Sequence, residues 1–305
     1  MHEHDENPVA QASSTTPAAE RPARWAVVGA AGMLGQDVVA RLERDGRDVT
    51  ALTRAELDVT DAAACLAALA GYDVVVNCTA WTAVDDAETQ EGAAFAVNAV
   101  GAANLAQAAA ARGARLVQVS TDYVFAGSAT TPYEADAVVA PVSAYGRTKA
   151  AGEWAVRAAS PQHHVVRTAW LYGAGGGSFP RTIARVAGER GAVSVVDDQR
   201  GQPTWTGDVA DLVVRLVDAD VPGGTFHATS SGEATWFDFA REAVATAGLD
   251  RDVVTPTTSA DFVRPAPRPS YSVLGHASLV AAGVTPIGDW RDRWAVAGPQ
   301  VVAPA

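Results

Sequence analysis

The sequence predicts an α/β fold, in which helices cover both faces of a doubly wound parallel sheet and a smaller C-terminal α/β lobe is attached. Short apolar runs alternate with segments of helical spacing over about 120 residues from Arg24. The first apolar run ends in the glycine-rich turn GAAGMLG at residues 29–35. The chain is 48% hydrophobic but only 7% aromatic, a balance typical of Ala- and Val-rich helices on a parallel sheet.

The first half of the chain predicts three strand–helix units followed by a fourth strand. Each expected strand is a short apolar run, and each expected helix has apolar residues at helical spacing. Asp61 is an expected N-cap, and Gly46 and Gly113 are expected helix ends. Strands are predicted at 24–30, 48–54, 73–80 and from 115, and helices at 33–45, 61–72 and 89–112. This alternation indicates a Rossmann-type sheet, whose ligands lie beyond the carboxyl ends of its strands.

The second half is less periodic and predicts the last strands of the sheet interleaved with the lobe. Helices are predicted at 145–160, 178–190, 206–219 and 235–248, strands at 164–168, 193–196 and 224–229, and a Pro-rich loop at 255–270. We expect residues 24–170 to form mainly the dinucleotide-binding domain and residues 171–305 the substrate-binding lobe with those last strands. Residues 1–23 are polar and are expected to form a disordered tail.

Composition argues against several classes of function. The formal net charge is −12 without a long basic cluster, which disfavours a nucleic-acid partner. No stretch approaches the ~20 apolar residues of a membrane span. Cys65 and Cys78 give neither a disulfide framework nor a metal-site spacing, and Cys78 is expected to be a buried structural thiol. A cytoplasmic protein with no nucleic-acid or membrane partner is expected.

The glycine-rich turn predicts a dinucleotide site. Gly29 permits the tight turn, Gly32 lets the backbone approach a pyrophosphate, and Gly35 lets the following helix lie close to the sheet. The helix N-terminus then offers unpaired N–H groups to the phosphates. The expected cofactor contacts here and after the third strand are Gly29, Gly32, Met33, Leu34, Gly35, Cys78, Thr79 and Ala80.

The end of the second strand bears on the choice of cofactor. Sites that select NAD usually place an Asp or Glu there for the ribose hydroxyls. Here the strand ends in Thr53-Arg54, with no carboxylate before Glu56. Arg54 is suited to attract a 2′-phosphate, although it also fits a surface arginine. NADPH is therefore favoured and use of NADH stays open, with Asp58 and Val59 placed to contact the adenine.

The chemistry is carried by Tyr145 and Lys149, which form a Y-x-x-x-K pair at the start of an expected helix. A spacing of four puts both side chains on one helical face. A phenol with a pKa of ~10 is a reluctant proton donor, and an ammonium one turn away lowers that pKa. Thr121 ends the fourth strand, where a hydroxyl can bind a substrate carbonyl or cap the strand. Asn98 is expected either to anchor a water or backbone carbonyl near the lysine, or to cap.

Five segments together resemble the dTDP-4-dehydrorhamnose reductase family, which belongs to the extended short-chain dehydrogenase/reductases. They are NCTAWTAVDDAE, VSTDYVFAG, SAYGRTKAAGE, VVRTAWLYG and VVDDQRGQPT. The similarity runs from about Arg24 to Trp290. The Y-x-x-x-K pair is shared by many relatives, whereas STDYVF, RTAWLYG and DDQxGxPT in this order are much more specific.

The resemblance implies a set of functional residues and a reaction. Thr121, Tyr145 and Lys149 would form the catalytic triad, together with Asp122, which would position the substrate. Substrate contacts are expected from Thr121, Asp122, Tyr123, Trp170, Gln202, Thr204 and Arg268, the last of these on the nucleotide. NADPH would reduce the 4-keto group of dTDP-4-dehydro-6-deoxy-L-mannose to give dTDP-L-rhamnose, with Tyr145 as proton donor. We expect a monomer or homodimer and no bound metal. The family often has Asn before the phenylalanine of the following helix, whereas this chain has Ser178 before Phe179. The substrate or cofactor contact expected at this position is therefore left unassigned.

Three other readings remain open on the residues alone. A 4-ketoreductase for another dTDP-deoxysugar would have the same catalytic set. Epimerases and 4,6-dehydratases share the Tyr/Lys pair, but a dehydratase commonly has Asp-Glu after the threonine, where Asp122 is followed by Tyr123. A non-catalytic regulatory subunit on this scaffold usually loses part of the Tyr/Lys pair, which is complete here.

Overall fold

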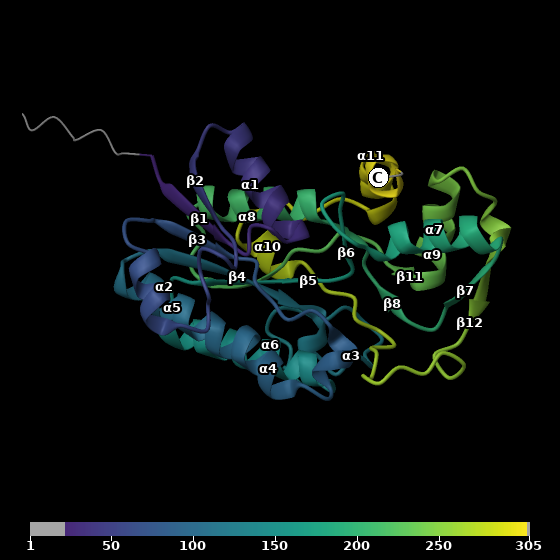
Figure 1. The fold of residues 1–305 in the computed structure, drawn as a ribbon, viewed down its shortest axis with the longest axis horizontal. Helices are drawn as coiled ribbons and strands as arrows, with labels where there is room; N and C mark the ends of the chain where they lie inside the picture. The colour runs from purple at the N-terminus through teal and green to yellow at the C-terminus, as the bar shows by residue number, and fades with distance from the viewer. Residues whose placement is uncertain (1–21, 304–305) are drawn as a thin grey trace, which may run out of the picture.

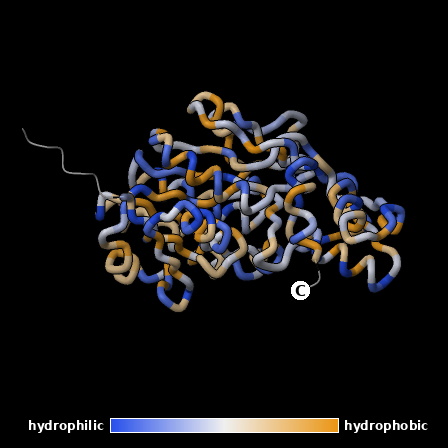
Figure 2. The backbone as a smooth tube through the Cα atoms, turned by 90° about the horizontal axis from the view of Figure 1, so that it is seen from above, coloured by the Kyte–Doolittle hydropathy of each residue, from blue (hydrophilic) through white to orange (hydrophobic). Residues whose placement is uncertain are grey.

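The computed structural model describes residues 22–303, which form a sheet flanked by helices with a smaller lobe beside it (Figure 1). The two parts lie next to each other along the long axis of the molecule, in the view from above as well (Figure 2). The tail expected at residues 1–23 falls almost entirely outside the described residues.

The sheet has six strands, all parallel, in the order β10-β5-β4-β3-β1-β2. The strands are β1 (Arg24–Val28), β2 (Asp48–Leu52), β3 (Val74–Asn77), β4 (Arg115–Thr121), β5 (His164–Thr168) and β10 (Gly224–His227). The chain leaves β1 on one side toward β2 and later returns to place β3 on the other side, which makes the sheet doubly wound. This confirms the predicted fold class.

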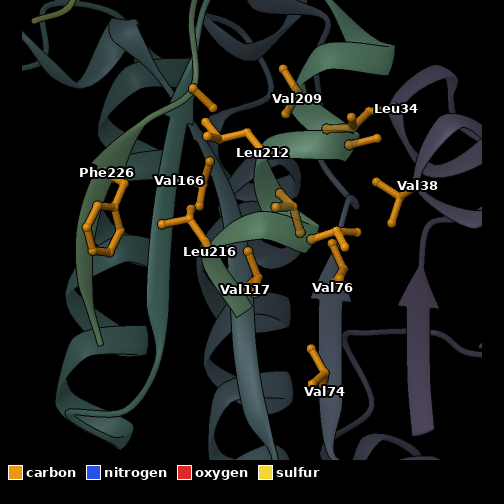
Figure 3. Close-up of a cluster of buried hydrophobic side chains, with 14 of the residues drawn as sticks. Leu34, Val38, Val74, Val76, Val117, Val166, Val209, Leu212, Leu216 and Phe226 are labelled. Carbon is orange, nitrogen blue, oxygen red and sulfur yellow. The ribbon is translucent and has the colours of Figure 1, made fainter. Parts of the chain in front are cut away.

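Helices cover both faces because the strand residues alternate between two apolar cores. On one face, Trp25, Val27, Val76, Val117 and Val166 pack against α1 and α8 (Figure 3). On the other face, Ala26, Val28, Val75, Leu116 and Val165 pack against α2, α5 and α6. The helices are α1 (Met33–Arg44), α8 (Thr206–Asp218), α2 (Ala62–Ala68), α5 (Ala102–Ala111) and α6 (Ala144–Ala159). Asp61 caps α2 as predicted, by accepting a hydrogen bond from the Ala64 amide at 3.0 Å.

The long helix expected at 89–112 is continuous but irregular. It begins as α4 (Glu91–Phe95), passes through a π-helical segment, η1 (Ala96–Gly101), and continues as α5. Within the described residues this one helix, Glu91–Ala111, is long and apolar enough to cross a membrane by length and composition, which the sequence pattern did not predict. It packs against α2, α6 and β4, as a core helix of this fold does.

The lobe is built from three helices and three pairs of short strands. The helices are α7 (Phe179–Arg190), α9 (Trp236–Thr246) and α11 (Trp290–Val302), and the strand pairs are β6 (Leu171–Tyr172) with β9 (Thr204–Trp205), β7 (Val193–Val196) with β12 (Val254–Thr257), and β8 (Arg200–Gly201) with β11 (Ala234–Thr235). Aromatic residues fill its core, where Phe239 contacts Tyr172, Trp290 and Trp294.

The predicted elements are confirmed apart from their ends, with one correction. The loop expected at 255–270 begins instead as strand β12, which pairs in parallel with β7 through Pro256. A proline is tolerated there because this two-stranded sheet leaves one side of the strand without a neighbour that needs its N–H. The short helices α3 (Val84–Ala87) and α10 (Ala277–Ala281) were not predicted, since four or five residues carry too little periodicity.

A buried ion pair joins α6 to the sheet. The Glu153 carboxylate accepts hydrogen bonds from Arg167 Nε at 2.9 Å and Nη2 at 2.8 Å, and both side chains are almost wholly inaccessible. Ser120 Oγ, at the end of β4, donates to the same carboxylate at 2.6 Å. Burial raises the pKa of Glu153, but Arg167, Ser120 and the half-exposed Arg157, 3.2 Å away, together hold it below its usual range. One carboxylate therefore connects α6, β4 and β5.

Glu153→Ala should destabilise the fold severely, by about 3–5 kcal/mol, because it leaves the Arg167 guanidinium buried without its partner. The matched control is Glu189→Ala, which removes an exposed pair with Arg185 and should cost less than about 1 kcal/mol. Urea unfolding of both variants measures the difference. Equal losses in the two variants would contradict the structural role of the buried pair.

Candidate active site

A cavity of about 650 Å³ lies where the carboxyl ends of the strands meet the lobe. Its walls come from the glycine turn, the ends of β3, β4 and β5, the start of α6, and Trp236 of α9. A second cleft of about 580 Å³, between α1 and α8, is lined mainly by charged side chains and contains none of the predicted residues. The first cavity is therefore the candidate site, at the edge that the fold class predicts.

The glycine turn has the geometry that its sequence predicted. Gly29 has a φ of +80°, and its amide donates to Leu52 O of β2 at 2.8 Å. A Cβ on Gly35 would collide with the backbone of Gly29. Gly32 caps α1 without any side-chain hydrogen bond to the first turn. The bare turn and the free N–H groups fit a dinucleotide pyrophosphate. Gly32, Met33, Leu34 and Gly35 line the cavity, while Gly29 supports them from beneath.

The segment after β3 forms the next part of the wall, through Cys78, Thr79 and Ala80. Asn98, in the π-helical segment, does not line the cavity. Its amide accepts from Trp81 N at 2.8 Å and donates to Trp81 O at 3.2 Å and to Thr148 Oγ1 at 3.0 Å. Of the two roles predicted for Asn98, the structure shows the backbone anchor, which fixes the 79–82 segment.

The residues predicted for the adenosine end lie outside the cavity. Arg54 is exposed just beyond β2, without an ion pair among the described residues. Asp58 turns back on its own loop, accepting from Thr60 N at 2.9 Å, and Val59 is buried against Gly101. Glu56 is held by Thr53, whose amide donates to it at 2.8 Å. Neither Asp58 nor Val59 is brought to the cavity, because this loop folds onto itself and onto η1.

Thr121, Tyr145 and Lys149 come together in the cavity, as predicted. Ser143 caps α6 by accepting from Gly146 N at 3.1 Å, which places Tyr145 in the first turn of the helix. Lys149 follows one turn later, and its Nζ donates to Val119 O of β4 at 2.7 Å. The three functional side chains therefore come from two elements that the buried Glu153 holds together.

The electrostatics of the triad differ from the expectation in one respect. Burial raises the pKa of Tyr145 to about 12, and only the Thr121 hydroxyl opposes this rise. Lys149 is not among the groups that act on this pKa, and its ammonium donates to the Val119 carbonyl. Burial also lowers the pKa of Lys149 to about 8, so its charge is retained at neutral pH. The phenol is thus firmly protonated in the free protein.

Asp122 lies beside the triad. It is fully buried, and burial raises the pKa of its carboxyl to about 6 against hydrogen bonds from Ser272 and Thr121. Thr121 Oγ1 donates to Asp122 Oδ1 at 2.9 Å. Tyr123 contacts Tyr145 edge to face, with ring centroids 5.6 Å apart. Both Asp122 and Tyr123 line the cavity.

Two tryptophans form the wall on the lobe side. Trp170, which was predicted, stacks on Trp236, which was not, with ring centroids 3.6 Å apart and planes 9° apart. Trp236 opens α9 after a capping box of Thr235 and Asp238. The capping box marks the start of the helix in the sequence. No local sequence pattern indicated that Trp236, the first residue of that helix, would reach the cavity.

Three predicted substrate contacts are not brought to the cavity. Gln202 is buried and bridges to the backbone of Leu274, at 3.1 Å and 2.8 Å. Thr204 is also buried, and its hydroxyl donates to Gln202 O. Arg268 pairs with Asp85 at 2.9 Å, beside the cavity residue Val84. Within residues 22–303, no group of three or more His, Cys, Asp or Glu side chains is placed to hold a metal ion.

Comparison with known proteins agrees with this geometry. Residues 24–297 match the RmlD substrate binding domain family. A probable dTDP-4,6-dihydroxy-2-methyloxan-3-one 4-ketoreductase of Streptomyces antibioticus is 50% identical over 92% of this chain and 96% of its own. The dTDP-4-dehydrorhamnose reductase of Streptomyces griseus is 50% identical over 88% and 90%.

A solved structure is also similar to this chain over most of its length. The dTDP-4-dehydrorhamnose reductase of Bacillus anthracis, in complex with NADP, is 33% identical, covers 89% of this chain and 97% of its own, and superposes with a TM-score of 0.86. With its glycine turn, its Thr–Tyr–Lys cavity and this match over nearly the whole described chain, the protein belongs to the RmlD substrate binding domain family.

Proposed function

We propose that this protein is an NADPH-dependent reductase of the 4-keto group of dTDP-4-dehydro-6-deoxy-L-mannose, giving dTDP-L-rhamnose. One observation carries the proposal: Thr121, Tyr145 and Lys149 line the same cavity as the glycine turn. The Streptomyces griseus relative is named for this reaction at 50% identity, and the Bacillus anthracis relative was solved with NADP.

NADPH supplies the hydride when it is bound. Residues of the chain supply the proton and the groups that surround the developing oxyanion. Tyr145 is the donor to the developing oxyanion at O4, since its buried phenol is protonated at neutral pH. Thr121 donates a second hydrogen bond to that oxygen. Lys149 keeps a positive charge in the cavity, on the same face of α6 as Tyr145, with its ammonium held at the Val119 carbonyl.

Asp122 restores the proton on Tyr145 through Thr121. The hydroxyl of Thr121 is hydrogen-bonded to the Asp122 carboxyl at 2.9 Å and interacts with Tyr145. This transfer follows the reduction, once O4 has taken the proton of Tyr145. When Asp122 is protonated, the hydrogen bond between the two side chains runs from Asp122 to Thr121 Oγ1. Asp122 then passes its proton to Thr121 while Thr121 passes its own to the phenolate, and Asp122 is left as the carboxylate, to be reprotonated from solvent. A carboxyl with a pKa of about 6 both holds and releases a proton near neutral pH, as this role requires.

The choice of NADPH is supported by Arg54. This arginine follows β2, whose Leu52 carbonyl is bound by the glycine turn, and it is exposed without an ion pair among the described residues. Glu56, two residues further on, is held by Thr53, and Asp58, whose pKa Arg54 helps to lower, accepts from Thr60. The 2′-phosphate of NADPH is a suitable partner for the free guanidinium, while NADH remains usable because no repelling group is present there.

The second candidate is a 4-ketoreductase for another dTDP-deoxysugar. The Streptomyces antibioticus relative is named for a different substrate at the same 50% identity. Both candidates use the same catalytic residues. Steady-state rates with the two sugars at equal concentration separate them.

The two parts of the chain divide the work. We assign cofactor binding mainly to residues 24–170 and sugar binding mainly to residues 171–305, from which Trp236 reaches the cavity. A cytoplasmic monomer or homodimer, without nucleic-acid or membrane partners, fits a chain of net charge −12.

Tyr145→Phe should lower kcat about 10²–10⁴-fold with little change in KM, because it removes only the proton donor. Loss of NADPH absorbance at 340 nm with dTDP-4-dehydro-6-deoxy-L-mannose measures this, and dTDP-L-rhamnose is the product to identify. Tyr72→Phe, beside Arg24 and outside the cavity, is the control. An active Tyr145→Phe, or a wild type that leaves NADPH unconsumed, would sink the proposal.

Asp122→Asn should be less active but more stable at neutral pH. The raised pKa means that the folded state favours protonated Asp122. This contribution is complete below about pH 4 and is lost as the pH rises through about 6. Asn cannot ionise, so the stability of the variant relative to wild type should increase by about 2 kcal/mol between pH 4 and pH 7. Urea unfolding at both pH values tests this. A pH-independent difference would contradict the assigned carboxyl, and the kcat loss should be smaller than that of Tyr145→Phe.

Arg54→Ala should raise the KM for NADPH roughly tenfold, the effect of losing about 1.4 kcal/mol, and leave the KM for NADH unchanged. Arg44→Ala, an exposed arginine at the end of α1, should change neither. An equal rise in the KM for NADPH and in the KM for NADH would contradict a contact between Arg54 and the 2′-phosphate.

A further inference from the structure

Trp170 has a backbone conformation that tryptophan rarely adopts. Its φ is +46°, in the left-handed region that is costly for a bulky side chain. The residue lies just after β5, at the edge of the cavity. Such strain persists only where the surroundings fix the residue in place, and it gathers at ligand sites.

The contacts that fix Trp170 all come from the lobe. Its indole stacks on Trp236 at 3.6 Å. Gly201 of β8 also lies against the Trp170 indole, so closely that a Cβ at this position would collide with it. The amide of Thr204 donates to Trp170 O at 3.2 Å. Removing any one of these would give the strained residue freedom to relax.

Trp236 is itself firmly placed. It is the first residue of α9, directly after the Thr235–Asp238 capping box, whose two hydrogen bonds are each 3.0 Å. Phe179 of α7 packs on its ring, with centroids 4.5 Å apart. Strand β11 pairs Ala234 with Gly201. Gly201 therefore lies on β8, and Trp236 directly follows β11, the strand that pairs with β8.

The tryptophan pair and the glycine turn line the same cavity from different strands of the sheet. In the sheet, β5 is separated from β1 by β3 and β4. Thr168, two residues before Trp170, lines the same cavity with a buried hydroxyl that has no hydrogen-bond partner. An apolar aromatic wall beside an unused hydroxyl suits a ligand with both C–H faces and hydroxyl groups, as a deoxysugar has.

We propose that Trp236 is a positioning residue that holds the Trp170 indole as the wall of the sugar subsite, so that the lobe sets the affinity for the sugar without affecting cofactor or nucleotide. The identity of the sugar nucleotide used below rests on the proposed function. The role of Trp236 rests on the stack, on Gly201 and on the strained backbone of Trp170.

The test compares dTDP-L-rhamnose with dTDP, which lacks the sugar, and with the cofactor NADPH. Titration calorimetry with dTDP-L-rhamnose, dTDP and NADPH is carried out on wild type, Trp236→Ala and Trp236→Phe. Trp236→Ala should weaken dTDP-L-rhamnose about tenfold and leave dTDP and NADPH within about twofold. Trp236→Phe keeps a stacking ring and should recover most of the loss. In turnover, Trp236→Ala should raise the KM for the sugar nucleotide and leave that for NADPH unchanged. Trp154→Ala, on the exposed side of α6, is the matched control.

A second variant guards against a fold defect. Gly201→Ala leaves Trp236 in place and displaces Trp170 directly, so it should give the same selective loss even if Trp236→Ala fails to fold. Unchanged affinity for dTDP-L-rhamnose in both variants, or an equal loss for dTDP, would overturn the assignment. A wild type that neither consumes NADPH nor binds dTDP-L-rhamnose more tightly than dTDP would instead count against the proposed function.

Discussion

The geometry of the site depends on the buried Glu153 carboxylate. Tyr145, Lys149 and Glu153 are spaced by four along α6, so the ion pair with Arg167 lies on the same helical face as the two chemical residues. Ser120, the neighbour of Thr121, binds the same carboxylate. A shift of α6 along the sheet would therefore break a desolvated ion pair, which is far more costly than the small free energy that most surface contacts supply.

Burial gives the catalytic groups their protonation states before any ligand binds. The same desolvation raises the pKa of Tyr145 to about 12, raises that of Asp122 to about 6 and lowers that of Lys149 to about 8. At neutral pH the phenol is thus neutral, the lysine charged and the aspartate close to its midpoint. A proton donor, a cation and a proton reservoir stand side by side, which matches the needs of carbonyl reduction.

The sequence was informative wherever the chemistry is local. The glycine turn, the Y-x-x-x-K spacing and the strand–helix alternation are short-range patterns, and the structure places them as expected. The sequence was silent where side chains meet from distant segments: Trp236 reaches the cavity 66 positions after Trp170, and no periodicity reports that pairing. The same reason explains why three predicted substrate contacts do not line the cavity. The Gln202 side chain bonds the backbone of Leu274 and Arg268 meets Asp85, contacts that are set by tertiary packing, while the Thr204 hydroxyl donates to the Gln202 carbonyl.

In the proposed assignment, the residues of the proton chemistry and the residues that fix the aromatic wall come from different parts of the fold. Thr121, Tyr145 and Lys149 belong to β4 and α6, fixed by Glu153, whereas the wall against Trp170 is set by β8 and α9 of the lobe. Two relatives that share 50% identity with the chain are named for different sugars. In the proposed mechanism the proton chemistry at C4 does not depend on the rest of the sugar, so the two names are compatible with one catalytic set. The aromatic wall is therefore where differences in substrate among such proteins should be sought, and the helix that carries Tyr145 is where they should be absent.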